Sequence, residues 1–269
     1  MRLRLTTWNV NSIRLREVSL ARVVETLNPD VLCLQEIKIE DERFPAEMCR
    51  RLGFEHLCVH GQKAYHGVAV LSRVPLQEPR FMRWCGIDHA RHAAVTLPGG
   101  IELHNLYIPA GGDIPDREAN PKFAHKLDML AELAAWFARR GLDAPPAILV
   151  GDLNIAPLET DVWSHKQLLD VVSHTPVEVE ALGRLQLAGS FVDAVRQVIR
   201  PEEKLYSWWS YRARDWEESD RGRRLDHVWV SPALASGIRG ASVLREARGW
   251  PQPSDHVPVT VDLEISHPG

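Results

Sequence analysis

The stretch AILVGDLNIAP, residues 147–157, joins an apolar strand to a group of polar residues, and the rest of the chain is best interpreted from it. Its first half has the length and β-branched content of a buried strand. Gly151, Asp152, Asn154 and Pro157 follow, and all four are ordinary turn formers. A turn alone predicts nothing elsewhere in the chain. A catalytic role for Asp152 and Asn154 predicts carboxylates, amides and a histidine at other strand ends, converging on one cleft.

The composition is typical of a globular protein with a large core: of 269 residues, 45% are hydrophobic and 25% are charged. No stretch reaches the roughly 18 apolar residues that a membrane span needs, and the segment MRLRLTTWNV lacks the apolar part of a secretory signal. The cysteines lack the paired spacing of a zinc site; they are Cys33, Cys49, Cys58 and Cys85. We therefore expect reduced thiols in a cytoplasmic protein with no membrane partner.

The formal net charge of −4 argues mildly against a dedicated nucleic-acid binder, because such proteins usually carry a basic patch. It does not exclude an enzyme that contacts a few phosphates through a metal ion and local arginines. Arginine is concentrated in residues 2–16 and 211–226, although acidic residues offset it in the second segment. Taken alone, both segments are interpreted as solvated charged surfaces.

Short apolar runs alternate with helical patterns. The spacing of apolar residues predicts helices over 15–27, with Leu15, Val18, Val23 and Leu27 on the apolar face, and over 119–139 and 177–188. Glycine, proline and aspartate mark loops at 108–121, 143–147 and 248–254. The runs of strand length are 3–9, 30–36, 67–72, 92–97, 101–108, 147–152, 226–231 and 257–265. This order of elements predicts an α/β fold with a mixed sheet, in one domain over residues 1–269.

Polar side chains occur where these strands begin or end: Asn9, Asn11, Glu36, Lys38, Tyr107, Asp152, Asn154, Asp226, Asp255 and His256. Any one of them is more simply explained as a turn, cap or core residue, because short motifs match by chance. Together they place carboxylates, amides, a phenol and an imidazole where α/β proteins build their sites. Turn formation explains that set poorly.

The residue types indicate metal-assisted hydrolysis of a phosphodiester. Glu36 with neighbouring amides offers oxygen ligands only, which suit Mg²⁺ or Mn²⁺ and do not suit zinc. Asp152 could position or activate a water molecule, while Asn154 and Tyr107 could donate hydrogen bonds to a phosphoryl oxygen. A carboxylate beside His256 would orient the ring and raise its pKa. The residues leave open whether Asp152 or His256 accepts the proton.

The motifs WNVNSIR, LQEIK, GVAVLS, LYIPAGG, GDLNIAP, SWWSYR, GRRLD and SDHVPV follow one another from about residue 5 to about residue 263. This series resembles the exonuclease III family of abasic-site (AP) endonucleases, within the endonuclease/exonuclease/phosphatase superfamily. The resemblance implies a four-layer α/β sandwich, in which two packed mixed sheets are flanked by helices. It also implies a monomeric, Mg²⁺-dependent DNA-repair phosphodiesterase, with Mn²⁺ as an alternative ion. Its substrate would be duplex DNA, cut 5′ to abasic sites and trimmed at 3′ ends.

The resemblance also implies a role for each matching residue. The implied catalytic residues are Tyr107, Asp152, Asn154, Asp226 and His256, with Asp226 paired to His256. The implied metal ligands are Asn11, Glu36 and Asp255, together with Asp152 and Asn154. Asn9, Lys38, Lys122 and Arg212 would contact phosphate or DNA. Trp208 and Leu225 would form the wall of a pocket for an extruded, baseless deoxyribose.

Three residues depart from the family pattern. Ala110 stands where close relatives carry an amide beside the tyrosine loop, so one phosphate contact is expected to be missing. Asp113 occupies a position where a relative carries a basic residue, and Arg223 replaces a larger apolar residue at the pocket rim. These departures leave open the balance between abasic-site cleavage and 3′ trimming. The alternatives are a superfamily phosphatase for a small phosphoester and a catalytically silent binding module.

Overall fold

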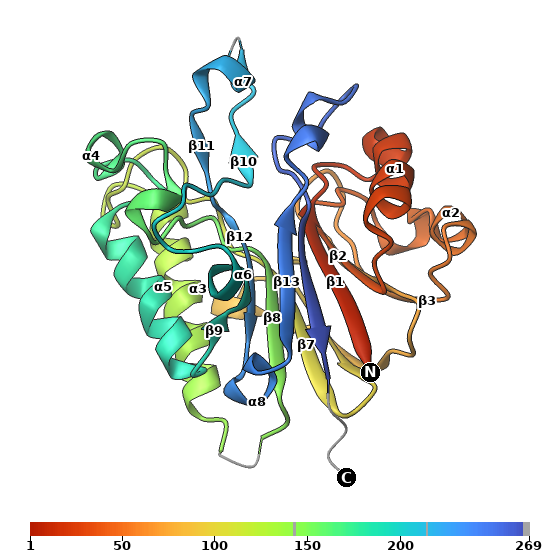
Figure 1. The fold of residues 1–269 in the computed structure, drawn as a ribbon. Coiled ribbons are helices and arrows are strands. Elements are labelled where there is room, and N and C mark those ends of the chain that lie inside the picture. Colours follow the sequence, from red (N-terminus) through yellow and green to blue (C-terminus); the bar gives the residue numbers. More distant parts are fainter. Residues whose placement is uncertain (142–143, 214, 266–269) are drawn as a thin grey trace.

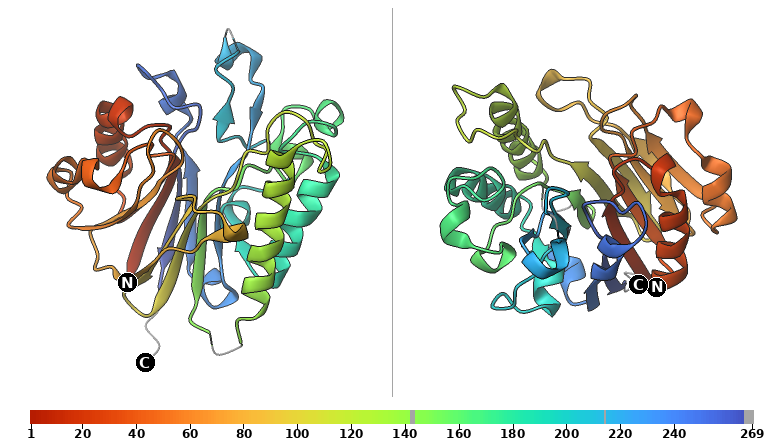
Figure 2. Two further views of the ribbon diagram at one scale, coloured as in Figure 1. Left: turned by 180° about the vertical axis from the view of Figure 1, so that it is seen from behind. Right: turned by 90° about the horizontal axis from the view of Figure 1, so that it is seen from above.

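Two six-stranded sheets pack face to face at the centre of the computed structural model, which describes residues 1–141, 144–213 and 215–265 (Figure 1). The first sheet has the order β13-β14-β1-β2-β4-β3 and the second has the order β5-β6-β7-β8-β12-β9. Helices cover the outer face of each sheet (Figures 1 and 2). The predicted four-layer α/β sandwich is therefore confirmed.

The first sheet consists of β1 Arg2–Asn9, β2 Val31–Gln35, β3 His56–His60, β4 Val68–Ser72, β13 Ile238–Val243 and β14 Val259–Glu264. The second consists of β5 Gln77–Arg80, β6 His92–Leu97, β7 Ile101–Tyr107, β8 Ala147–Asp152, β9 Val192–Asp193 and β12 Asp226–Val230. A separate ribbon of β10 Trp208–Trp209 and β11 Gly222–Arg223 projects beyond the sheets (Figure 1). All eight predicted strands are present. The loop predicted at 143–147 is described only from residue 144 onward.

The α-helices are α1 Glu17–Leu27, α2 Ala46–Arg51, α3 Pro121–Ala138, α4 His165–Leu168, α5 Pro176–Ala188, α6 Ala194–Val198, α7 Trp216–Ser219 and α8 Pro232–Ala235. Short 3₁₀ turns are η1 Arg14–Arg16, η2 Asp41–Arg43, η3 Trp84–Gly86, η4 Glu159–Asp161 and η5 Arg245–Gly249. The three predicted helices correspond to η1 with α1, to α3 and to α5. Among the described residues, no helix is both long enough and apolar enough to cross a membrane.

The buried face of α1 differs from the prediction. Leu15 and Val18 are 60% and 85% exposed, whereas Leu20, Val23 and Val24 are buried. Leu20, Val23 and Val24 have the i, i+3, i+4 spacing of one helix face, and Val18 lies on the opposite face. The prediction therefore found the helix but assigned part of its apolar face to solvent-facing positions.

One parallel strand pair in each sheet brings the polar strand ends to a common edge. β1 runs parallel to β2 with Asn9 opposite Gln35, and β7 runs parallel to β8 with Tyr107 opposite Asp152. β12 runs antiparallel to β8, so its first residue, Asp226, also lies opposite Asp152. The carboxyl ends of β1, β2, β7 and β8 thus meet where α/β folds place their ligand sites.

Candidate active site

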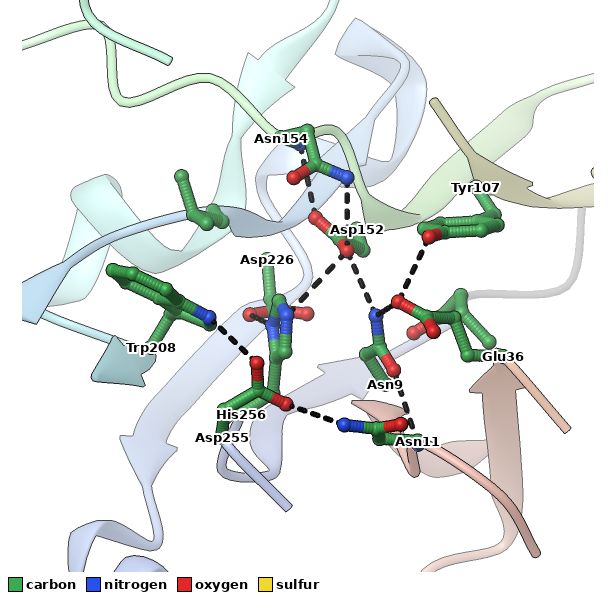
Figure 3. Close-up of polar contacts among 12 residues, drawn as sticks. Asn9, Asn11, Glu36, Tyr107, Asp152, Asn154, Trp208, Asp226, Asp255 and His256 are labelled. Carbon is green, nitrogen blue, oxygen red and sulfur yellow. Dashed lines mark hydrogen bonds and ion pairs between the residues drawn. The ribbon is translucent and has the colours of Figure 1, made fainter. Parts of the chain in front are cut away.

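A cleft of ≈ 740 Å³ opens at this edge, and residues at the strand ends of both sheets and residues of the β10–β11 ribbon line it. Figure 1 shows that the ribbon projects from this end of the sheets, and Figure 3 shows the polar side chains gathered there. The volume of the cleft is within the range of small-molecule and cofactor sites. Among the predicted site residues, those that line the cleft are Glu36, Tyr107, Asp152, Asn154, Trp208, Arg212, Leu225, Asp255 and His256. Asn9, Asn11 and Asp226 lie directly behind this wall, hydrogen-bonded to residues in it.

The backbone of GDLN explains why the strand ends as it does. Gly151 has φ +136, and a Cβ there would lie 1.9 Å from the carbonyl oxygen of Leu106. Only glycine lets β7 and β8 approach this closely. Asn154 has φ +53, and its backbone N–H donates to Asp152 Oδ1 at 2.9 Å. The turn therefore directs both polar side chains into the cleft instead of continuing the strand.

Asn9 links the acidic groups of the two sheets. Its Nδ2 donates to Glu36 Oε1 and to Asp152 Oδ2, each at 2.9 Å. Tyr107 donates its phenol proton to the same Glu36 oxygen at 2.8 Å. Burial would raise the pKa of Glu36, but the Lys38 ammonium and the hydrogen bonds from Asn9 and Tyr107 outweigh it, so the pKa is lowered. Glu36 is consequently held as a carboxylate.

The surroundings of Lys38 test whether a hard cation fits here. Its ammonium lies 2.7 Å from Glu36 Oε2 and 2.6 Å from Asn11 Oδ1. Asn11 Nδ2 in turn donates to Asp255 Oδ1 at 3.0 Å. The Lys38 ammonium thus contacts oxygen atoms of Glu36 and Asn11, and oxygen ligands are the donor set that Mg²⁺ or Mn²⁺ prefers. The residues fit such an ion, while a phosphate contact of Lys38 stays a prediction.

His256 lies between two carboxylates. Its Nδ1 is 2.8 Å from Asp226 Oδ2, and its Nε2 is 3.6 Å from Asp152 Oδ2. Ser207 donates its hydroxyl proton to the same Asp226 oxygen at 2.6 Å. Burial would lower the pKa of His256, but the two carboxylates raise it to about 10. Burial also raises the pKa of Asp152 to about 7, although the imidazolium opposes this rise.

Asp152, Asp226 and His256 each present one ligand atom within 4.8 Å of the others, a spacing that a metal ion could bridge. We favour the oxygen set around Glu36 for the metal. A metal among Asp152, Asp226 and His256 would have to displace a proton from an imidazole that two carboxylates keep charged. The pairing of Asp226 with His256 accounts for the same geometry without a metal.

Trp208 and Leu225 lie together on one wall of the cleft. Trp208 Nε1 donates to Asp255 Oδ2 at 3.0 Å, so the wall is tied to the polar site (Figure 3). Arg223 stacks on Trp208 with 5.3 Å between its guanidinium carbon and the ring centroid. Ala110, Asp113 and Arg223, the three residues expected to depart from the family pattern, also line the cleft.

The two predicted DNA contacts outside the cluster differ in position. Arg212 is exposed and lines the cleft at the ribbon. Lys122 is also exposed, in the first turn of α3 and outside the lining of the cleft. A role for either residue in binding DNA remains a prediction.

Several residues that support the site were absent from the sequence prediction. Ser254 accepts from the N–H of His256 and donates to the carbonyl of Asn9, which joins the SDH turn to β1. Arg16 donates to the carbonyl of Asn11 at 2.5 Å. Lys126 is fully buried beneath Asn154. Its position offered a signal, because it lies within the apolar stripe formed by Phe123, Leu127 and Leu130.

The chain is similar to known proteins over nearly its whole length. A family model described as "Endonuclease/Exonuclease/phosphatase family" matches residues 6–256. The chain is 30% identical to exodeoxyribonuclease III of Haemophilus influenzae over 96% of this chain and 98% of that protein. Among solved structures, an AP endonuclease from Archaeoglobus fulgidus superimposes with a TM-score of 0.90 at 30% identity, covering 98% of this chain and 100% of that one. A 3′ phosphatase from Neisseria bound to a product DNA hairpin gives 0.89 at 32% identity, with the same coverage.

Proposed function

The chain belongs to the endonuclease/exonuclease/phosphatase family, and we propose that it is a Mg²⁺-dependent DNA-repair nuclease of the exonuclease III type. Its substrate is duplex DNA, which it cuts 5′ to abasic sites and from which it removes nucleotides or blocking groups at 3′ ends. Mn²⁺ is the alternative ion. The enzyme acts in the cytoplasm as a monomer of one domain, residues 1–269.

One observation carries this proposal: Asn9 Nδ2 bridges Glu36 and Asp152. A metal ligand and a residue acting on water must both reach one phosphate, so their carboxylates must lie close together. The bridge holds the carboxylates of Glu36, from LQEIK, and of Asp152, from GDLN, at a single nitrogen atom. A chance set of turn residues has no reason to meet in this way.

The metal would be held by Glu36, Asn11 and Asp255. When bound, it would supply positive charge to stabilise the phosphoryl oxygens. The chain's own residues supply the remaining steps. Tyr107 and Asn9 orient Glu36, and Asn154 donates a hydrogen bond to Asp152 Oδ2 at 3.1 Å, so the carboxylate is fixed in direction.

The geometry favours Asp152 over His256 as the proton acceptor. Both ring nitrogens of His256 face carboxylates, and an imidazole placed in this way carries protons on both of them. Such a ring donates hydrogen bonds and cannot accept a proton from water. We therefore assign His256 to hold the phosphoryl oxygen and Asp152 to orient and deprotonate the attacking water.

Two alternatives are less well supported. A phosphatase for small phosphoesters does not need the tryptophan ribbon in its site, yet Trp208 and Ser210 line the cleft. A silent binding module does not need His256 hydrogen-bonded to Asp226 through Nδ1, with its Nε2 3.6 Å from Asp152. A second candidate, phosphatase activity on a DNA 3′ end, is favoured by the likeness to the Neisseria 3′ phosphatase and by Arg223, which covers the ring of Trp208.

The decisive experiment uses three DNA duplexes. The first carries an internal abasic analogue, the second a recessed 3′ end, and the third a 3′-phosphate. Each is incubated with the protein in Mg²⁺, in EDTA, and in EDTA followed by excess Mg²⁺. We expect incision and trimming that EDTA abolishes and Mg²⁺ restores. Release of phosphate only would support the second candidate, and binding without hydrolysis of any duplex would contradict both.

A further inference from the structure

Lys126 is a completely buried lysine beneath the floor of the cleft, on the helix α3. Its ammonium donates to the carbonyl of Asn154 at 2.8 Å and to the carbonyl of Ala110 at 3.2 Å, and it forms an ion pair with Glu178. Burial lowers the pKa of Lys126, and the Glu178 carboxylate opposes this. The ammonium therefore has three protein acceptors and no exposure to solvent.

Glu178, the partner of Lys126 in this ion pair, also has a structural role. Its Oε2 accepts from the N–H of Ser173 at 2.9 Å and from the hydroxyl of Thr175 at 2.6 Å. The same oxygen accepts from the backbone N–H of Thr175 at 3.2 Å, which completes the capping box at the start of α5. Neutralising this carboxylate is one reason for a buried lysine here. It does not explain why the ammonium also reaches two loop carbonyls of the active site.

Those carbonyls belong to segments with unusual backbone conformations. Asn154 has a left-handed φ of +53, and its side chain donates to the carbonyl of Ile108 and to Asp152. Gly111, next to Ala110, has φ +94, and a Cβ at Gly111 would lie 3.0 Å from Lys126 Cδ. The lysine thus touches the chain just after β7 and just after β8, the parallel strands that carry Tyr107 and Asp152.

We propose that Lys126 is a positioning residue for phosphodiester cleavage: its buried ammonium holds the carbonyl of Asn154, and thereby fixes the side chains of Asn154 and Asp152 for reaction. Lys126 does not touch the substrate. Without the ammonium, the carbonyl of Asn154 is buried with no donor, and its left-handed turn loses one of the contacts that hold it. The inference rests on the proposed function for its reaction.

The experiment compares three variants. Lys126→Met combined with Glu178→Gln removes both charges and leaves neither stranded. Lys126→Arg keeps the charge but moves the donors, because the longer side chain cannot place nitrogen atoms where Nζ lies in a packed core. Arg140→Met is the matched control. It breaks a partly buried ion pair with Glu102 just beyond the other end of α3, among residues that do not line the cleft.

Turnover and KM are measured for the abasic duplex and for bis(4-nitrophenyl) phosphate, together with the melting temperature. We expect the double variant to lose about 10- to 100-fold in kcat on both substrates, while KM for the duplex changes less than about threefold, because a misplaced group costs rate more than binding. Arg140→Met should lower the melting temperature and keep kcat. A double variant with wild-type kcat, or a control with the same loss of kcat, would overturn the proposal.

Three further outcomes are decisive. If the double variant does not fold, Lys126→Arg decides: a wild-type melting temperature with reduced kcat supports the proposal, and an unchanged kcat overturns it. If the wild type cleaves the small diester but no duplex, the proposed function fails while the role of Lys126 is still measured on the diester. A wild type that cleaves neither overturns both.

Discussion

Asp152 and His256 face each other across the junction of the two sheets, with 3.6 Å between Asp152 Oδ2 and His256 Nε2. Asp152 ends β8 of the second sheet, and His256 precedes β14 of the first. The other ring nitrogen of His256 pairs with Asp226. The imidazole thus lies between two carboxylates: that of Asp152, which would act on water, and that of Asp226, at the start of β12.

Asp152→Asn and His256→Ala should each lower kcat by on the order of 10²-fold or more, since each group acts on charge that changes in the transition state. Combining them should cost much less than the product of the two effects, because both serve one step. Steady-state rates on an abasic duplex measure this. Near-wild-type turnover in either single variant would identify a structural residue in place of a catalytic one.

Glu36→Gln should raise the Mg²⁺ concentration needed for half-maximal rate while leaving affinity for DNA in EDTA nearly unchanged. The neutral amide keeps the shape of Glu36 and can still accept from Asn9 and Tyr107, but it loses the charge that attracts a hard cation. Rates across a Mg²⁺ titration and a binding assay without metal separate the two effects. Full activity of the wild type in excess chelator would refute the metal assignment.

The sequence predicted the strands with strong apolar runs and missed the edge and ribbon strands. β5 (QEPR) is mostly exposed, and β3 and β13 are only half-buried along most of their length, so none has a strong apolar pattern. β9, β10 and β11 have two residues each, which is too short for any periodicity. Such strands form because a neighbour offers hydrogen-bonding groups, and this information is not local.

The polar strand ends could be found in the sequence because each follows or begins a strong strand. Their supports could not, because Ser207 and Ser254 act through contacts that only the folded chain creates. Arg224 shows the same limit: within a charged segment it was interpreted as solvated, yet it is buried against Asp161. Burial of a charge depends on a distant partner, so composition alone cannot reveal it.

Asp161→Asn should destabilise the protein by about 3–5 kcal/mol at pH 7, because it leaves two buried guanidinium groups, Arg224 and Arg196, without their shared carboxylate. Burial would raise the pKa of Asp161, but these arginines lower it below its ordinary value. Because the pKa of Asp161 is lower in the folded state, its charge stabilises the fold fully at any pH above its unfolded-state pKa of about 4. This stabilisation is lost as the pH falls through the folded-state pKa.

Urea unfolding of the wild type and Asp161→Asn from pH 7 down to pH 3 tests this. The difference in unfolding free energy should stay constant above about pH 5 and shrink below about pH 4. Asp262→Asn is the control, since its ion pair with Arg4 is exposed and should contribute less than about 1 kcal/mol. An equal effect of the two substitutions would show that burial of Asp161 adds nothing.

Trp208→Ala should reduce abasic-site incision more than 3′ trimming. Incision requires a sugar in mid-duplex to leave the stack, at a cost of a few kcal/mol, and contact with an aromatic wall offsets part of it. A terminal nucleotide frays without help and depends less on that wall. Because Trp208 Nε1 also holds Asp255, Trp208→Phe separates the two roles: it keeps a ring and loses the hydrogen bond. Trp208→Phe should lower the rates of incision and of trimming together and preserve their ratio. If Trp208→Ala leaves the ratio of incision to trimming unchanged, Trp208 has no role in substrate selection.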